Sequence, residues 1–209
     1  MAIIRRAVLR AAVALSLALG FAGAPALAQG PTPAEEYIRV NIQKGLDILN
    51  DSSLGADARR EQFRSFLESL TDFHRVAMFT LGPVARTASD ADKEAFAAAF
   101  HAYAVAVYDK RLSRYNGQQL KVTGSTEHGA GDVVVHATLT DKNGGNPTAI
   151  DFRVLDEGGK LVLMDASVEG IWLSIEERDQ FVGFLGNHNN DIQALIQHLN
   201  ALTADLRRR

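Results

Sequence analysis

The strongest constraint on the fold is a series of short alternating segments in the middle of the chain, joined by brief glycine-rich connections. Four segments have the pattern of strands: residues 118–127, 131–141, 148–156 and 160–168. In Ile150-Asp151-Phe152-Arg153-Val154, for example, apolar and polar side chains alternate with the two-residue period of a strand. The connections are too short for a crossover between parallel strands. The segments therefore predict an antiparallel meander of hairpins.

Helical patterns occupy both flanks of this meander. We expect helices from about 34 to 50, across 63–70, up to Leu81, from Ser89 to about Tyr115, and twice after residue 173. Ser174 with Glu177 has the spacing of a capping box at the start of the first closing helix. Helices, then consecutive strands, then helices predict an α+β layer fold.

The first 28 residues have the pattern of a secretory signal peptide. A start with three Arg precedes a short apolar run, and small residues lead to an Ala-Leu-Ala end at Ala28. The run is too short and too rich in Ala and Gly for a good transmembrane helix. We expect cleavage after Ala28, export, and a single domain over residues 29–209. The adjacent Arg5 and Arg6 leave both Sec and twin-arginine export open.

Composition narrows the classes of function. Cleavage would remove three Arg and no acidic residue, which changes the formal net charge from −3 to −6. Such an acidic domain is unsuited to nucleic acid or to constitutive attachment to anionic lipid surfaces. The chain has no Cys, so disulfides, thiol catalysis and thiolate metal sites are excluded. The 181 residues after Ala28 are enough to build a core without such links.

Motifs for common enzyme classes are missing from the sequence. The six His form neither an H-x-H nor an H-E-x-x-H pattern, so we expect no metal site and no cofactor. No G-x-S-x-G, S-x-x-K, Walker or Rossmann pattern occurs. Acyl transfer and nucleotide binding therefore have no support in the sequence.

One acidic residue requires separate consideration. Alternation places Asp165 on the same face of its strand as Leu161 and Leu163. A carboxyl group among apolar neighbours can serve as a general base. Alternatively, Asp165 pairs with an Arg or caps the following turn, because a buried carboxylate usually needs a partner.

An ordered set of segments carries a family resemblance. These are Asp72-Phe73-His74-Arg75-Val76-Ala77, Leu81-Gly82 with Arg86-Thr87-Ala88, Phe96 and Phe100, Tyr108 through Tyr115-Asn116-Gly117, and Asp165-Ala166-Ser167-Val168-Glu169-Gly170-Ile171 leading into Arg178-Asp179-Gln180-Phe181. Together they resemble the MlaC family of periplasmic phospholipid-binding proteins, also called the toluene-tolerance family. The match covers nearly all of the chain after the signal peptide.

The resemblance implies both a fold and a role. The fold would be a four-stranded twisted antiparallel sheet wrapped by N-terminal and C-terminal helices around an apolar pocket. The role would be that of a periplasmic carrier, not an enzyme, which holds acyl chains in the pocket and the head group near its mouth. Its partners would be an outer-membrane lipoprotein complex and an inner-membrane ABC transporter complex.

Face assignments and the resemblance together predict the residues that bind lipid. These are Phe73, Leu81, Phe100, Tyr103, Val107, Val135, Phe152, Val154, Met164 and Trp172. Trp172 stands where many members have Ser, and its surroundings resemble the branch associated with hopanoid biosynthesis. We expect phospholipid as the cargo, with a hopanoid or another polycyclic lipid as the alternative. An enzyme acting on an apolar substrate through Asp165, and an assembly protein with a solid core, are the remaining hypotheses.

Overall fold

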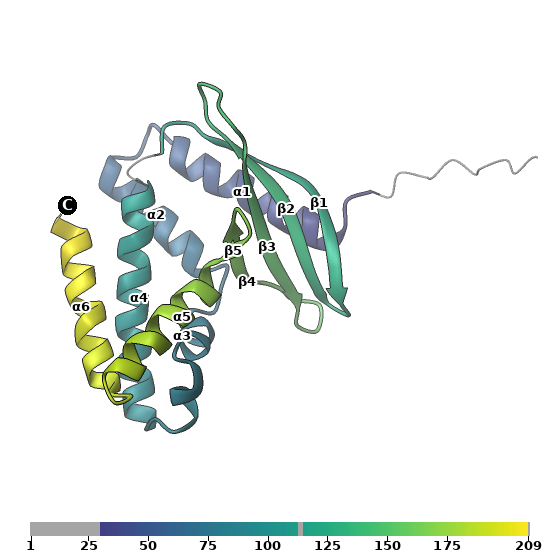
Figure 1. The fold of residues 1–209 in the computed structure, drawn as a ribbon. Coiled ribbons are helices and arrows are strands. Elements are labelled where there is room, and N and C mark those ends of the chain that lie inside the picture. Colours follow the sequence, from purple (N-terminus) through teal and green to yellow (C-terminus); the bar gives the residue numbers. More distant parts are fainter. Residues whose placement is uncertain (1–29, 113–114, 209) are drawn as a thin grey trace, which may run out of the picture. The chain divides into compact units, whose positions relative to one another are not determined.

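The computed structural model describes residues 30–112 and 115–208 (Figure 1). The predicted signal peptide, residues 1–28, lies outside these residues. The fold described below belongs to the unit Pro31–Arg209. Within the described ranges, no helix has the length and apolar character needed to cross a membrane.

The sheet is the antiparallel meander that the alternating segments predict. Its strands are β1 (Gln119–Gly129), β2 (Asp132–Thr140), β3 (Thr148–Asp156), β4 (Leu161–Val168) and β5 (Ile171–Trp172). They lie in the order β1-β2-β3-β4-β5, so each strand pairs with the next one along the chain. The sequence did not predict β5, because two residues are too few to show an alternating pattern.

Helices precede and follow the sheet, which confirms the predicted α+β class. They are α1 (Pro33–Asn50), α2 (Ala56–Glu68), α3 (Phe73–Thr80), the 3₁₀ helix η1 (Gly82–Arg86), α4 (Asp90–Leu112), α5 (Leu173–Asn187) and α6 (Ile192–Arg208). The long helix was expected to reach Tyr115, but Tyr115 is not helical. In Figure 1, α4 and α6 run side by side, and α1 lies along the sheet.

A β-bulge in β4 reverses one of the predicted faces. Val154 of β3 pairs with Leu163, whereas the adjacent Arg153 pairs with Asp165, so Met164 is an extra residue in the ladder. A shift of one residue moves every later side chain to the opposite face of the sheet. Asp165 therefore does not share a face with Leu163. That prediction was wrong because strict alternation cannot anticipate a bulge.

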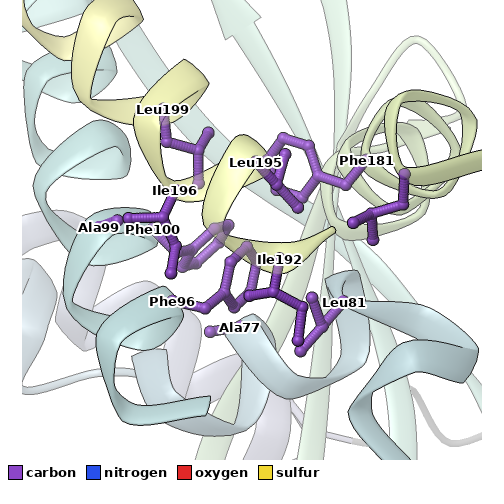
Figure 2. Packing of buried hydrophobic residues seen from close by; sticks show 11 residues of the cluster. Ala77, Leu81, Phe96, Ala99, Phe100, Phe181, Ile192, Leu195, Ile196 and Leu199 are labelled. Atoms are coloured by element: carbon purple, nitrogen blue, oxygen red, sulfur yellow. The ribbon is translucent and has the colours of Figure 1, made fainter. Parts of the chain in front are cut away.

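One hydrophobic core lies among the helices (Figure 2). Phe96 of α4, Phe181 of α5, and Leu195 and Leu199 of α6 are each at most 3% exposed. The rings of Phe96 and Phe181 meet edge to face, with centroids 6.0 Å apart. This core is formed where the amphipathic face of α6, predicted from its leucine and isoleucine spacing, packs against α4.

A second core lies between α1 and the sheet. Ala34 and Ile38 of α1 pack against Val135 of β2 and Val154 of β3, and all four side chains are at most 3% exposed. The packing of α1 against this face of the sheet leaves the opposite face to other elements. The two cores together position the sheet and the helices that line the site described next.

The start of α5 is capped differently from the prediction. Trp172 occupies the N-cap position and makes no side-chain capping bond. The Ser174 hydroxyl donates to the Asp165 carboxylate of β4, and Glu177 turns towards Tyr103 of α4. The predicted Ser174–Glu177 capping box is therefore wrong. Both side chains find tertiary partners that local spacing cannot reveal.

Candidate functional site

A cavity lies between α3, α4, α5 and β4, and we call it cavity A. It contains about 770 Å³ of space, part of it open to solvent. Its lining is Thr71, Phe73, Val76, Phe100, Tyr103, Ala104, Val107, Tyr108, Arg111, Leu163, Met164, Asp165, Ala166, Leu173, Ser174 and Glu177. Most of this wall is apolar, and it includes Ala104 of α4 and Ala166 of β4. An apolar hollow with a few polar groups is the usual form of a small-molecule site.

Helical spacing explains how α4 contributes so much of the wall. Phe100, Ala104, Val107 and Arg111 follow one another at intervals of four, three and four residues, which places them on one face of the helix, and Tyr103 lies next to Ala104 on that face. Small Ala104 lies between larger neighbours on this face, so the wall is recessed there. The α4 face supplies aromatic and aliphatic contact surface over more than two helical turns.

A second cavity, which we call cavity B, lies between α1, α2 and the sheet. It also contains about 770 Å³ of space, part of it open to solvent. Its lining is Ile38, Asn41, Ile42, Gly45, Leu46, Leu49, Phe63, Phe66, Leu67, Leu70, Tyr115, Gln118, Leu120, Leu139, Phe152 and Leu163. The α2 residues among them form the amphipathic stripe recognisable in the sequence.

The two cavities share Leu163 of β4 as part of their walls. At this point the backbone N–H of Leu163 donates to the carbonyl of Leu70, with 3.1 Å between nitrogen and oxygen. Leu70 lines cavity B, and the adjacent Thr71 lines cavity A. The segment between α2 and α3 is therefore tied to β4 at the boundary between two apolar spaces.

Polar groups of cavity A are concentrated where α4 faces α5. The Tyr103 hydroxyl donates to Glu177 Oε1 at 3.4 Å. Burial raises the pKa of Glu177, and burial together with the nearby Glu177 charge raises the pKa of Tyr103 to about 12. Burial likewise raises the pKa of Tyr108. The lining thus combines an apolar surface with a small set of desolvated polar groups.

Asp165 has a structural task in this arrangement. Its carboxylate accepts hydrogen bonds from the backbone N–H of Ser174 at 3.1 Å, from the Ser174 hydroxyl and from the backbone N–H of Ala166. These bonds tie the first turn of α5 to β4. The sequence left a pairing with an Arg or a cap of the following turn open for Asp165, whereas these bonds are to the neighbouring Ala166 and to Ser174 at the start of α5.

The structure places the ten predicted lipid-binding residues in four settings. Cavity A is lined by Phe73, Phe100, Tyr103, Val107 and Met164, and cavity B by Phe152. Trp172 lines a third hollow with Phe79 and Ile175. The two hydrophobic cores contain Leu81, Val135 and Val154. Sequence reasoning missed Ala104, Tyr108, Arg111 and Glu177. The Phe100–Tyr103–Val107 stripe, continued by one turn, reaches Arg111, whereas Ala104 and Tyr108 directly follow Tyr103 and Val107 in the chain.

Among the residues that the structure describes, no group of three or more His, Asp or Glu side chains is arranged to hold an ion. The cavity therefore offers surface for a largely apolar ligand and no ligand set for a metal.

Comparison with known proteins assigns the chain to a family. The sequence model of the MlaC protein family matches residues 39–201, which is most of the chain. The chain belongs to the MlaC family. This is a family of periplasmic phospholipid-binding carriers without enzymatic activity, so the enzyme hypothesis built on Asp165 is set aside.

A solved structure supports the fold of this MlaC-family protein. It is a phospholipid-binding protein from Ralstonia solanacearum in complex with a phospholipid, with 22% sequence identity and a TM-score of 0.73. The likeness covers 84% of this chain and 99% of the other. The α+β arrangement of helices around a meander is therefore shared across low sequence identity. Neither comparison points to a hopanoid.

Proposed function

We propose that this protein binds the acyl chains of a phospholipid in cavity A and carries the lipid through the periplasm. The lipid would pass between an outer-membrane lipoprotein complex and an inner-membrane ABC transporter complex. The observation that supports this proposal is cavity A itself, an apolar hollow walled by α3, α4, α5 and β4. Membership of the MlaC family supports the same role. So does the phospholipid bound by the Ralstonia solanacearum protein of the same fold.

Apolar burial supplies the binding energy that such a carrier needs. Each methylene removed from water contributes about 0.8 kcal/mol. Two long acyl chains would nominally reach the practical ceiling of about 20 kcal/mol for non-covalent binding. A bilayer shelters the same chains from water, so exchange between the carrier and a membrane is close to balanced. The carrier then needs a dry pocket more than it needs many polar contacts.

The predicted lipid-binding residues divide into contact and support roles under this proposal. Those that line cavity A, among them Phe73, Phe100 and Met164, would touch the acyl chains directly. Phe152 would touch a chain that extends into cavity B. The surrounding elements would be held in place by the buried Leu81, Val135 and Val154 and by Trp172, which lines a separate hollow.

Mass spectrometry of co-purified lipid tests the carrier function. The full chain is expressed in a bacterium, purified without detergent and extracted with organic solvent. We expect glycerophospholipid in the extract at a fixed ratio to protein. Recovery of a hopanoid instead would replace the cargo. A folded protein that yields no lipid, and takes none up from vesicles, would refute the proposal.

The periplasmic location is tested on the same preparation. Export with cleavage after Ala28 predicts a mature chain that begins at Gln29 and is recovered by osmotic release from intact cells. An intact mass that includes the first 28 residues would contradict the predicted cleavage.

A further inference from the structure

One charged group in cavity A has no task in holding acyl chains. Glu177 lies on α5 and faces the cavity beside Tyr103 and Arg111 of α4. Its Oε1 is 3.4 Å from the Tyr103 hydroxyl, which is long for a hydrogen bond between two oxygens. Its Oε2 is shielded from water and has no hydrogen-bond partner among the residues of the structure that are described. A buried carboxyl group in this state is costly, because native interiors almost always satisfy such atoms.

No basic side chain in the described ranges neutralises this carboxyl group. The ion pairs formed by residues 30–112 and 115–208 do not include Glu177. Arg111 lines the same cavity, and its charge acts on Glu177 without an ion pair between them. Cavity A thus contains a carboxyl group and a guanidinium that are close but not paired. The space between them is available to a ligand with both signs of charge.

The polar part of a phospholipid can satisfy both groups at once. A phosphate accepts hydrogen bonds from a guanidinium, and a primary ammonium donates to a carboxylate and a phenol oxygen. Rotation about the last torsion of the Glu177 side chain is soft, so either carboxylate oxygen can turn to the ligand. We propose that Glu177, with Tyr103 and Arg111, selects lipids whose head group carries a primary ammonium beside a phosphate. This inference rests on the proposed carrier function and names the class of lipid carried.

The proposed site distinguishes head groups by their hydrogen-bond donors. A primary ammonium has three N–H donors for Glu177 and Tyr103. A choline head group carries the same charge but no N–H, so it leaves Glu177 Oε2 without a partner. A glycerol head group donates only through neutral hydroxyls and leaves the lipid with net negative charge near a carboxylate. Hydrogen bonds to charged groups contribute about 1.5–3 kcal/mol, which corresponds to a preference of about ten-fold or more.

Head-group competition tests the inference. The purified protein is incubated with vesicles of phosphatidylethanolamine, phosphatidylcholine and phosphatidylglycerol in equal amounts and with identical acyl chains. It is then re-isolated, extracted and analysed by mass spectrometry. We expect phosphatidylethanolamine to exceed phosphatidylcholine in the protein-bound fraction by about ten-fold. Glu177→Gln keeps the shape of the side chain and removes its charge, so the lipid bound by this variant should lose the enrichment.

Two further variants separate recognition from structure. Glu176→Gln changes the exposed neighbouring residue on the same helix and should keep the enrichment. Tyr103→Phe removes one acceptor and should reduce the enrichment while it keeps the aromatic packing against Phe181. Bound lipid with the composition of the vesicles, or enrichment that persists in Glu177→Gln, would overturn the inference while the carrier function stands. A parent protein that binds no lipid would refute the carrier function and this inference with it.

Discussion

Ala104→Trp should block lipid binding while it leaves the fold intact. Ala104 lies on the α4 face that lines cavity A, between the larger residues Phe100 and Tyr108. An indole placed here enters the cavity and occupies space that acyl chains would fill. An aromatic side chain covers about 150–250 Å² of apolar surface, and each Å² is equivalent to about 25 cal/mol. At the lower bound the lost ligand burial is about 4 kcal/mol, or roughly a thousand-fold in affinity.

The assay is the ratio of extracted phospholipid to protein after purification without detergent, with circular dichroism as the test of folding. Ala98→Trp is the matched control, because Ala98 is an exposed residue of the same helix. Parent and Ala98→Trp should carry lipid, and Ala104→Trp should be folded and largely empty. A folded Ala104→Trp protein that carries as much lipid as the parent would refute the assignment of cavity A as the binding site.

Further substitutions test the packing and the electrostatics that shape the site. Leu199→Ala removes a fully buried side chain of α6 and should lower the free energy of unfolding in urea by about 2–5 kcal/mol. Gly82→Ala should destabilise the protein by more than about 1 kcal/mol, because φ is +64° and the new Cβ would lie 2.6 Å from Val182 Cγ2. A Cβ added at Gly183 of α5 meets open space. Gly183→Ala should therefore raise the free energy of unfolding by up to about 1 kcal/mol, because Ala has the higher helix propensity. Burial raises the pKa of Glu177 in the folded protein above its value in the unfolded chain. The protonated carboxyl group therefore stabilises the fold at low pH, and this contribution is lost as the pH rises through the folded-state pKa. Glu177→Gln should therefore melt higher than the parent at neutral pH, with a difference that shrinks towards pH 4; a difference independent of pH would contradict the burial of a charge.

Periodicity made most of the fold predictable. The two-residue alternation of β3 and the short glycine-rich links leave an antiparallel meander as the simple solution, because no parallel crossover fits. The leucine and isoleucine spacing of α6 likewise predicts one buried face, and Leu195 and Leu199 are fully buried there. Both signals are local, so they can be recognised before any tertiary contact is known.

The side-chain directions near the site, in β4 and at the start of α5, were less predictable because they depend on a bulge and on tertiary contacts. The bulge at Met164 separates Asp165 from Leu163, and nothing in the local sequence marks that extra residue. Glu177 has the spacing of a capping box with Ser174, yet both side chains turn to partners on other elements. Local propensity specifies what a side chain can do, and tertiary contacts decide which of the options it takes.

By itself the sequence determined the class of fold, the order of its elements and a family whose members carry lipid. It also determined which residue types were available: aromatic side chains and alanines on α4, and a chain without Cys. Only the tertiary structure decided that part of this apolar surface surrounds a cavity while Leu81, Val135 and Val154 pack solidly. The physical reason is that a periodic apolar pattern predicts only that a side chain is buried. Whether it then meets another side chain or an empty space depends on how distant elements are spaced.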